Sequence, residues 1–348
     1  MTYMRLLSTA IVMIFAALIL SCPVAAEDRT LGIAVRELPS RSYDEAARIA
    51  AASGARYATL PLQWDEVETK PGKYSPETDW LAIAAAYYPT IGWKVALEFN
   101  PIDTLADRRP AWLKDKPWDD PEVIRSFQNM LREVMPRSAD IELVSLAVGN
   151  EVDAHLGADG ESWAHYTALV VAARDVVKSM RPALKLGVKT TFPNATGDTM
   201  ALVQALNEKT DLVMITYYPI TPDFHTRSPA SPKADFELMT AAYPEREIHL
   251  AEIGYPSGGQ CSSGEEAQSE FVANAFAAWD QHASQIKAMY WDWMTDISAQ
   301  EVGQAADYYR LSDRCFSEFV ATLGLETREP RPKKAWHVFA DEARRRFR

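Results

Sequence analysis

Short apolar runs alternate with longer segments of helical apolar spacing along the chain from Leu31 onward. A short apolar run between polar residues is typical of a buried strand, and apolar residues spaced three to four apart indicate an amphipathic helix. The predicted strands are residues 31–36, 57–64, 93–100, 141–150, 184–191, 212–218, 248–253 and 286–293. The predicted helices include residues 43–53, 120–134, 162–180, 200–206, 236–242, 265–282 and 334–346. About eight repeats of this alternation predict an α/β fold, the TIM (β/α)8 barrel.

Length and composition support a single folded domain. The chain has 348 residues, of which 47% are hydrophobic and 24% charged, and α/β barrels commonly reach this length as one domain. No internal repeat, low-complexity segment or long linker interrupts the pattern. We therefore expect one barrel domain over residues 27–348.

The first 26 residues have the features of a secretory signal peptide. Arg5 precedes a largely apolar stretch, and small residues end it at Ala26, where cleavage is expected. The apolar stretch is short for a membrane span. A second interpretation takes residues 19–22 as a lipidation motif that anchors the protein through Cys22. Both interpretations predict a secreted or periplasmic protein without a membrane span, and we expect it to be a monomer.

Net charge and cysteine content limit which partners and which cellular compartment we expect for the protein. The formal net charge of −12 disfavours nucleic acid as a partner. Cleavage after Ala26 removes one of the three cysteines and leaves Cys261 and Cys315. An even number of cysteines in an oxidising compartment predicts one disulfide; two unpaired thiols are the alternative.

Two glutamates at the ends of predicted strands are the candidate catalytic residues. Strand 141–150 leads into Gly149-Asn150-Glu151, and strand 248–253 contains Glu252 near its end. Barrel enzymes hold their chemistry at the carboxyl ends of the strands. Cleavage of a glycosidic bond needs one protonated and one ionised carboxyl group, and a separation of about 5 Å gives retention whereas a wider gap gives inversion. The sequence predicts the pair but not its separation.

Other residues near the predicted strand ends suit a sugar-binding site. We expect an amide to hold a sugar hydroxyl, a tyrosine to orient Glu252, an arginine to keep Glu252 ionised, and tryptophans to offer flat apolar faces. A polar residue of the third strand would line the floor of the cleft or make a structural hydrogen bond. Asn150 is the candidate amide, Tyr217 or Tyr218 the tyrosine, and Arg36 the arginine. The candidate tryptophans are Trp64, Trp291 and Trp293, and the polar residue of the third strand is Asn100.

Several other reaction classes lack their motifs in this sequence. The six histidines show no metal-binding spacing, and neither a Gly-x-Ser-x-Gly elbow nor a glycine-rich phosphate loop is present. We expect neither a metal nor a cofactor.

The candidate residues resemble those of the retaining glycoside hydrolases of clan A. The resemblance rests on Asn150-Glu151, Glu252, the Tyr-Tyr-Pro at 217–219 and Trp291, and within the clan the sequence is most similar to the family 53 endo-β-1,4-galactanase (arabinogalactanase) group. It covers most of the mature chain, including QWDEVETKPGKYS near the second strand and the closing PRPKKAW.

The resemblance implies a role for each matched residue. Glu151 would be the acid/base, Glu252 the nucleophile, Asn150 a substrate contact and Trp291 the platform beneath the cleaved sugar. The chain departs from the family in lacking a convincing match to its calcium-binding loop and a histidine at the end of the third strand. The expected substrate is therefore a β-linked polysaccharide or oligosaccharide, with β-galactan as one candidate. The alternative is a non-catalytic carbohydrate-binding or sensing barrel.

Overall fold

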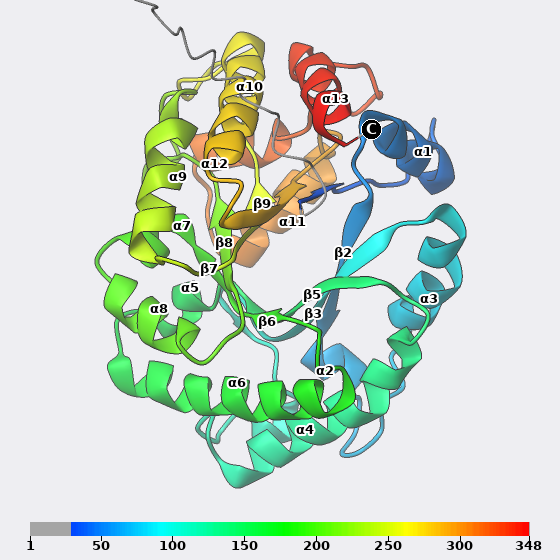
Figure 1. Ribbon diagram of the computed structural model, residues 1–348, viewed down its shortest axis with the longest axis vertical. Helices are drawn as coiled ribbons and strands as arrows, with labels where there is room; N and C mark the ends of the chain where they lie inside the picture. The colour runs from blue at the N-terminus through cyan, green and yellow to red at the C-terminus, as the bar shows by residue number, and fades with distance from the viewer. Residues whose placement is uncertain (1–28, 348) are drawn as a thin grey trace, which may run out of the picture.

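The computed structural model describes residues 29–347, in which helices surround a set of strands (Figure 1). The predicted signal peptide and Cys22 lie outside these residues. The strands are β1 (Thr30–Ile33), β2 (Tyr57–Gln63), β3 (Lys94–Asp103), β4 (Ala106–Asp107), β5 (Leu143–Asn150), β6 (Leu186–Gly187), β7 (Lys189–Thr191), β8 (Val213–Tyr217), β9 (Ile248–Ile253) and β10 (Ile286–Trp291).

The helices alternate with the strands, and some of them are additions to the predicted set. They are α1 (Tyr43–Ser53), α2 (Trp64–Val67), α3 (Trp80–Ile91), α4 (Pro121–Val134), α5 (Val152–Leu156), α6 (Gly160–Met180), α7 (Phe192–Thr196), α8 (Met200–Asn207), α9 (Ser231–Ala242), α10 (Glu265–Gln281), α11 (Ala299–Tyr309), α12 (Arg314–Ala321) and α13 (Lys334–Arg346). The unpredicted ones of eight residues or more are α3, α11 and α12. None of the helices in the described residues is both long and apolar enough to cross a membrane.

The strands form a closed parallel barrel, as predicted. One sheet has the order β1-β10-β9-β8-β7 and the other β2-β3-β5-β6, while the short β4 pairs antiparallel with β3. The backbone amide of Arg56 donates to Leu31 O at 2.8 Å, which joins β1 to the start of β2, and β6 continues into β7 after Val188. Counting β6 and β7 as one strand, the described residues contain the eight strands of a (β/α)8 barrel.

Strand alternation divides the side chains between the barrel interior and the helix layer. In β8, Met214 faces a small interior cavity together with Glu98, Lys189 and His249 from other strands. Its neighbour Ile215 belongs instead to the large core between strands and helices. A one-residue difference in position thus decides whether a side chain can reach the barrel mouth.

Helices α11 and α12 follow β10 and build a second apolar core. Its buried members include Ile297, Phe316, Phe319 and Leu323, with the segment between β8 and α9 packed against them. A disulfide between Cys261 and Cys315 ties the segment after β9 to α12, the pairing expected from the sequence. Helix α11 was not predicted; it has no fully buried residue, and its apolar face of Val302, Ala305, Ala306 and Tyr309 is only partly buried against the second core.

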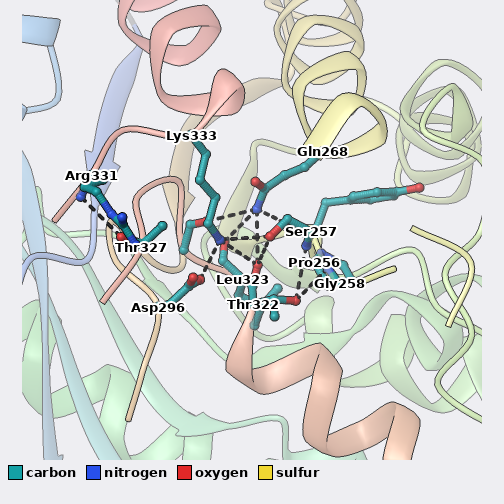
Figure 2. Close-up of polar contacts among 12 residues, drawn as sticks. Pro256, Ser257, Gly258, Gln268, Asp296, Thr322, Leu323, Thr327, Arg331 and Lys333 are labelled. Carbon is teal, nitrogen blue, oxygen red and sulfur yellow. Dashed lines mark hydrogen bonds and ion pairs between the residues drawn. The ribbon is translucent and has the colours of Figure 1, made fainter. Parts of the chain in front are cut away.

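A buried lysine fastens the end of α12 to the barrel (Figure 2). The Lys333 ammonium donates to Ser257 Oγ at 2.9 Å, Asp296 Oδ1 at 2.7 Å and Gly324 O at 2.8 Å. Gln268 of α10 also donates to Gly324 O, at 3.1 Å. Burial lowers the pKa of Lys333 despite the neighbouring Asp296. These bonds connect the segments after β9, β10 and α12, so the second core is held firmly on the barrel.

Candidate active site

Glu151 is placed by a tight turn at the end of β5. Gly149 has φ 87° and Glu151 has φ 43°, both in the left-handed region that favours glycine. A Cβ at position 149 would lie 2.4 Å from the hydroxyl of Tyr166, so only glycine fits there. The turn directs the Glu151 side chain into a cavity at the barrel mouth. Strained backbone of this kind persists where the surrounding structure enforces it.

The Glu151 carboxyl group is buried and accepts two hydrogen bonds. Thr216 Oγ1 donates to Oε1 at 2.7 Å, and Thr104 Oγ1 donates to Oε2 at 3.3 Å. Burial, followed by the negative charge of Glu252, raises the pKa of Glu151 to about 8. A carboxyl group with this pKa holds its proton at neutral pH, as a general acid must.

A β-bulge in β9 directs Glu252 toward the same cavity. Leu250 and Ile253 pair with Met289 and Trp291 of β10, so β9 advances three residues where β10 advances two. On the other side, Glu252 pairs with Thr216 of β8 after a register shift. The extra residue allows Ala251 to face the barrel interior and Glu252 the mouth. Bulges of this kind re-aim side chains beside active sites.

Glu252 is held by a cation and a hydroxyl group. Lys189 Nζ lies 3.0 Å from Oε1, and the Tyr218 hydroxyl donates to Oε2 at 2.9 Å. Both contacts favour the ionised carboxylate. Lys189 is only 4% exposed and forms a second ion pair with Glu98 at 2.6 Å. Burial acts to lower the pKa of Lys189, but the charges of Glu98 and Glu252 outweigh it and raise the pKa.

A third carboxyl group, that of Asp292, lines the cavity beside Glu252. The Tyr218 hydroxyl lies 3.3 Å from its Oδ2. Burial, and then the charge of Glu252, raise the pKa of Asp292 well above its usual range. We infer that Asp292 is neutral in the resting site, beside the ion pair between Lys189 and Glu252.

Asn150 offers an unused hydrogen-bond acceptor at the cavity wall. Its Nδ2 donates to Asp103 Oδ1 at 3.0 Å, and Gln63 Nε2 lies 3.3 Å from Asp103 Oδ2. The Oδ1 of Asn150 is buried without a hydrogen-bond partner in the described structure. Because a buried acceptor without a partner is unfavourable, this oxygen is suited to accept a hydrogen bond from a ligand hydroxyl.

The cavity has a volume of about 440 Å3. Strand ends provide its polar side, and the segment after β8 together with α11, α12 and Leu323 provides most of its apolar side. Its lining residues are Asn150, Glu151, Thr191, Pro193, Asn194, Thr216, Tyr218, Ile220, Phe224, Glu252, Asp292, Trp293, Ala305, Tyr309, Phe316, Phe319, Val320 and Leu323.

Two predicted sugar platforms are core residues instead. Trp64 is fully buried, stacks edge-on against Phe127 with ring centroids 4.8 Å apart, and donates to Glu68. Trp291 is 1% exposed and packs against Phe276 and other rings of the helix layer. These predictions were wrong because both side chains pack into the large core between strands and helices. Trp293, beyond the end of β10, does line the cavity, and the Arg36 guanidinium lies 4.9 Å from its ring centroid.

The remaining predicted residues divide in the same way. Tyr217 faces the helix layer and donates to Asp235 at 2.7 Å, so it does not orient Glu252. Arg36 pairs with Glu301 of α11 at 2.7 Å, and the cation beside Glu252 is Lys189 instead. Asn100 is 1% exposed in β3 and is not among the lining residues. The expected position of Arg36 beside Glu252 is therefore corrected, and so is the expectation that Asn100 lines the floor of the cleft.

Sequence reasoning missed Asp292, Thr216 and, beside Glu252, Lys189. Lys189 interrupts an otherwise apolar and hydroxylated strand. Lysine is rarely buried without a charged partner, and that rarity was the available signal. In the described residues, no group of acidic, histidine or cysteine side chains is arranged to hold a metal ion.

Replacing Glu151 with glutamine should stabilise the folded protein at alkaline pH. The pKa of Glu151 is raised in the folded state, so its stability contribution is complete below the ordinary pKa of about 4.5 and is lost as pH rises toward about 8. The Glu151→Gln variant lacks this loss. Thermal melting should show a higher midpoint for the variant at pH 9 and a smaller difference at pH 5. A difference that is independent of pH would contradict the raised pKa.

Sequence comparison with models of known families and with curated proteins gives no match. The fold, in contrast, is similar to solved structures. A variant of the GH5_18 protein of Streptomyces cattleya in complex with Manβ1-4GlcNAc has a TM-score of 0.69 and 19% identity, with 91% of this chain and 80% of that chain covered.

Two further structures extend the comparison. The exo-β-1,4-mannosidase of Opitutaceae bacterium strain TAV5 gives a TM-score of 0.71 at 17% identity, over 92% of this chain and 60% of the mannosidase. A family 39 glycoside hydrolase from Bacteroides cellulosilyticus WH2 gives 0.59 at 17% identity, over 91% of this chain and 64% of that one. The chain therefore shares its barrel fold with these proteins.

Proposed function

We propose that this protein is a glycoside hydrolase that cleaves a β-linked glycoside with retention, using Glu151 as acid/base and Glu252 as nucleophile. The observation that carries the proposal is the difference between the two carboxyl groups. Burial and the charge of Glu252 keep the proton on Glu151, whereas Lys189 and Tyr218 hold Glu252 in a setting that favours its ionised form. Glycosidases need this division between acid and nucleophile.

The short connection between the two glutamates supports retention over inversion. Thr216 pairs with Glu252 across the sheet and donates a hydrogen bond to Glu151 at 2.7 Å. Thr216 is thus a backbone neighbour of Glu252 that contacts the Glu151 carboxyl group, and the charge of Glu252 acts on the pKa of Glu151. Retaining enzymes have carboxyl groups about 5–5.5 Å apart, and inverting enzymes need room for a water between them.

The proposed reaction has two steps that conserve the configuration of the sugar. In the first, a Glu252 oxygen bonds to the anomeric carbon as the bond to the leaving oxygen breaks, and Glu151 gives its proton to that oxygen. In the second, Glu151 takes a proton from water, the water oxygen bonds to the anomeric carbon, and Glu252 is released. The ester in the first product removes the negative charge of Glu252, which favours ionised Glu151 as the base.

Names of the structural neighbours support a carbohydrate substrate. The mannosidase acts on β-1,4 linkages by its name, and the GH5_18 structure contains Manβ1-4GlcNAc. Membership of clan A fits these similarities and the positions of Asn150, Glu151 and Glu252. The resemblance to family 53 and the use of β-galactan stay predictions, as do cleavage of the signal peptide and a secreted or periplasmic location.

Hydrolysis with retention should be visible with a panel of β-glycosides and β-glycans. The first product observed by proton NMR should be the β-anomer of the released sugar, before mutarotation. Release of the α-anomer first would overturn the retaining mechanism. Binding of panel members without release of sugar would favour the non-catalytic carbohydrate-binding barrel.

Activity should decline as the pH rises past about 8. The pKa of Glu151 is raised to about 8, and the enzyme needs this group protonated for the first step. The profile of kcat/KM against pH reports the free enzyme, so its alkaline limb should have a midpoint near 8. An alkaline limb near pH 5, the ordinary range of a carboxyl group, would remove Glu151 from the role of acid.

A further inference from the structure

The apolar side of the cavity has a composition that a sugar ring does not need. Ile220, Ala305, Val320 and Leu323 line it with aliphatic groups. Sugars bind through hydroxyl partners or flat aromatic faces, and these aliphatic side chains offer neither. The polar groups of the cavity belong mainly to the strand ends on the other side, among them Asn150 and Thr216.

The aromatic side chains of this wall already pack against one another at steep angles. The rings of Phe319 and Tyr218 lie at 89° with centroids 5.5 Å apart, and those of Phe316 and Phe224 lie at 72° and 5.1 Å. All four residues belong to the second apolar core. The wall is therefore the continuation of a packed core into the cavity.

This wall is held in place from two sides. The disulfide between Cys261 and Cys315 fixes the start of α12. The Lys333 ammonium binds the carbonyl of Gly324 just after α12, next to Leu323 (Figure 2). A preformed apolar surface loses little conformational freedom on binding, so its contacts contribute fully to affinity.

The wall reaches the side of the cavity where the leaving group would stand. Tyr309, at the end of α11, lines the cavity, and its hydroxyl group forms a hydrogen bond with Thr104. Thr104 in turn donates a hydrogen bond to Glu151. The ring of Tyr309 also packs against Phe316, with centroids 5.5 Å apart. The apolar wall thus extends from beside the proton donor.

The charges of the cavity do not suit an acidic substrate. It is lined by the carboxyl groups of Glu151, Glu252 and Asp292. Lys189, the cation beside them, is already engaged by Glu98 and Glu252. Arg36, next to Trp293, is paired with Glu301. A uronic acid or sulfated sugar would have to enter without a free cation in this lining.

We propose that the substrate is an uncharged β-glycoside with an apolar alkyl or aryl leaving group, which the wall formed by α11, α12 and the segment after β8 receives. This proposal rests on the proposed hydrolytic function, because the leaving group is defined by it. The substrate class differs from the polysaccharide expected from the sequence. Contacts with the aliphatic wall next to Glu151 would make a glycoside with an apolar leaving group bind more tightly than one without it.

Methyl and octyl β-glycosides of the same sugars test this substrate class. Their leaving alcohols have similar acidity, so a difference between them reports the apolar contact and not the chemistry. A set of glucosides, galactosides, mannosides, xylosides, N-acetylglucosaminides and glucuronides would be measured below the micellar concentration, for hydrolysis and by calorimetry. We expect the octyl compound of the preferred sugar to bind at least about tenfold more tightly than the methyl compound.

The Phe316→Ala variant should shrink this octyl advantage to about threefold or less. Leu238→Ala is the matched control, because Leu238 is 46% exposed on α9 and lies outside the cavity lining; its octyl advantage should equal that of the unmodified protein. Equal affinity for methyl and octyl compounds, no binding of either, or preference for a β-glucuronide would overturn the substrate class. Tight octyl binding without hydrolysis would instead contradict the proposed function and leave the apolar subsite standing.

Discussion

The Glu252→Ala variant should lose at least about a thousandfold in kcat and remain folded. The loss is expected because the variant lacks the carboxylate proposed to form the covalent bond to the anomeric carbon. Folding should survive because Lys189 keeps Glu98, 2.6 Å away, as its partner when Glu252 is removed. Steady-state kinetics on a substrate from the panel and a thermal melt would measure both results. Full activity in the variant would refute the assignment.

Sodium azide distinguishes the roles of the two glutamates. In Glu252→Ala, azide can occupy the space of the missing carboxylate and attack the substrate once, which gives the α-glycosyl azide. In Glu151→Ala, azide attacks the glycosyl ester from the other face and gives the β-glycosyl azide, provided that the leaving group departs without an acid. The opposite pairing of variant and product would exchange the two roles.

The Lys189→Met variant should lose both stability and activity. The change leaves Glu98 and Glu252 as two buried carboxyl groups without their common cation. Loss of one partner from a buried ion pair costs about 3–5 kcal/mol, and denaturant unfolding should show a decrease of this order. Activity should fall because Glu252 loses the cation that lies 3.0 Å from its Oε1, and steady-state kinetics would measure the loss.

A double variant separates the two effects of Lys189. Glu98→Gln combined with Lys189→Met removes one of the uncompensated charges, so much of the lost stability should return. Activity should stay low, because Glu252 still lacks its cation. A double variant with restored activity would show that Lys189 acts only on the fold, and a stable single variant would contradict the buried ion-pair arrangement.

The barrel was predictable because its strands are buried on both faces and read as apolar runs. Helices 43–53 and 334–346 begin and end where the pattern predicts them. The missed helices differ from the predicted ones in how they are buried: α3 is apolar around much of its surface and contains Pro89, and the apolar face of α11 is only partly buried. Tertiary position, and not local periodicity, determines these helices.

Residues of the candidate site could be predicted only where the residue type and its position at a strand end were enough to suggest a role. Glu151, Glu252, Asn150 and Tyr218 could be named, although the choice between Tyr217 and Tyr218 depends on which face of β8 each occupies. Assigning Trp291 to the cavity failed for the same reason. The apolar wall could not be predicted from the sequence, because it depends on how α11 and α12 fold back over the barrel.

The bulge in β9 makes the reacting pair depend on the length of a strand as well as on its residues. Leu250 and Ile253 are fixed in the core by their neighbours, and β9 has one residue more between them than β10 has between their partners. A chain shortened by Ala251 could keep every functional side chain and the same core, yet its glutamate would take the inward position of Ala251 in the barrel interior instead of facing the mouth. A search for related enzymes should therefore compare spacing around this glutamate, since a homologue with every matching residue and one fewer position would be a barrel without a nucleophile.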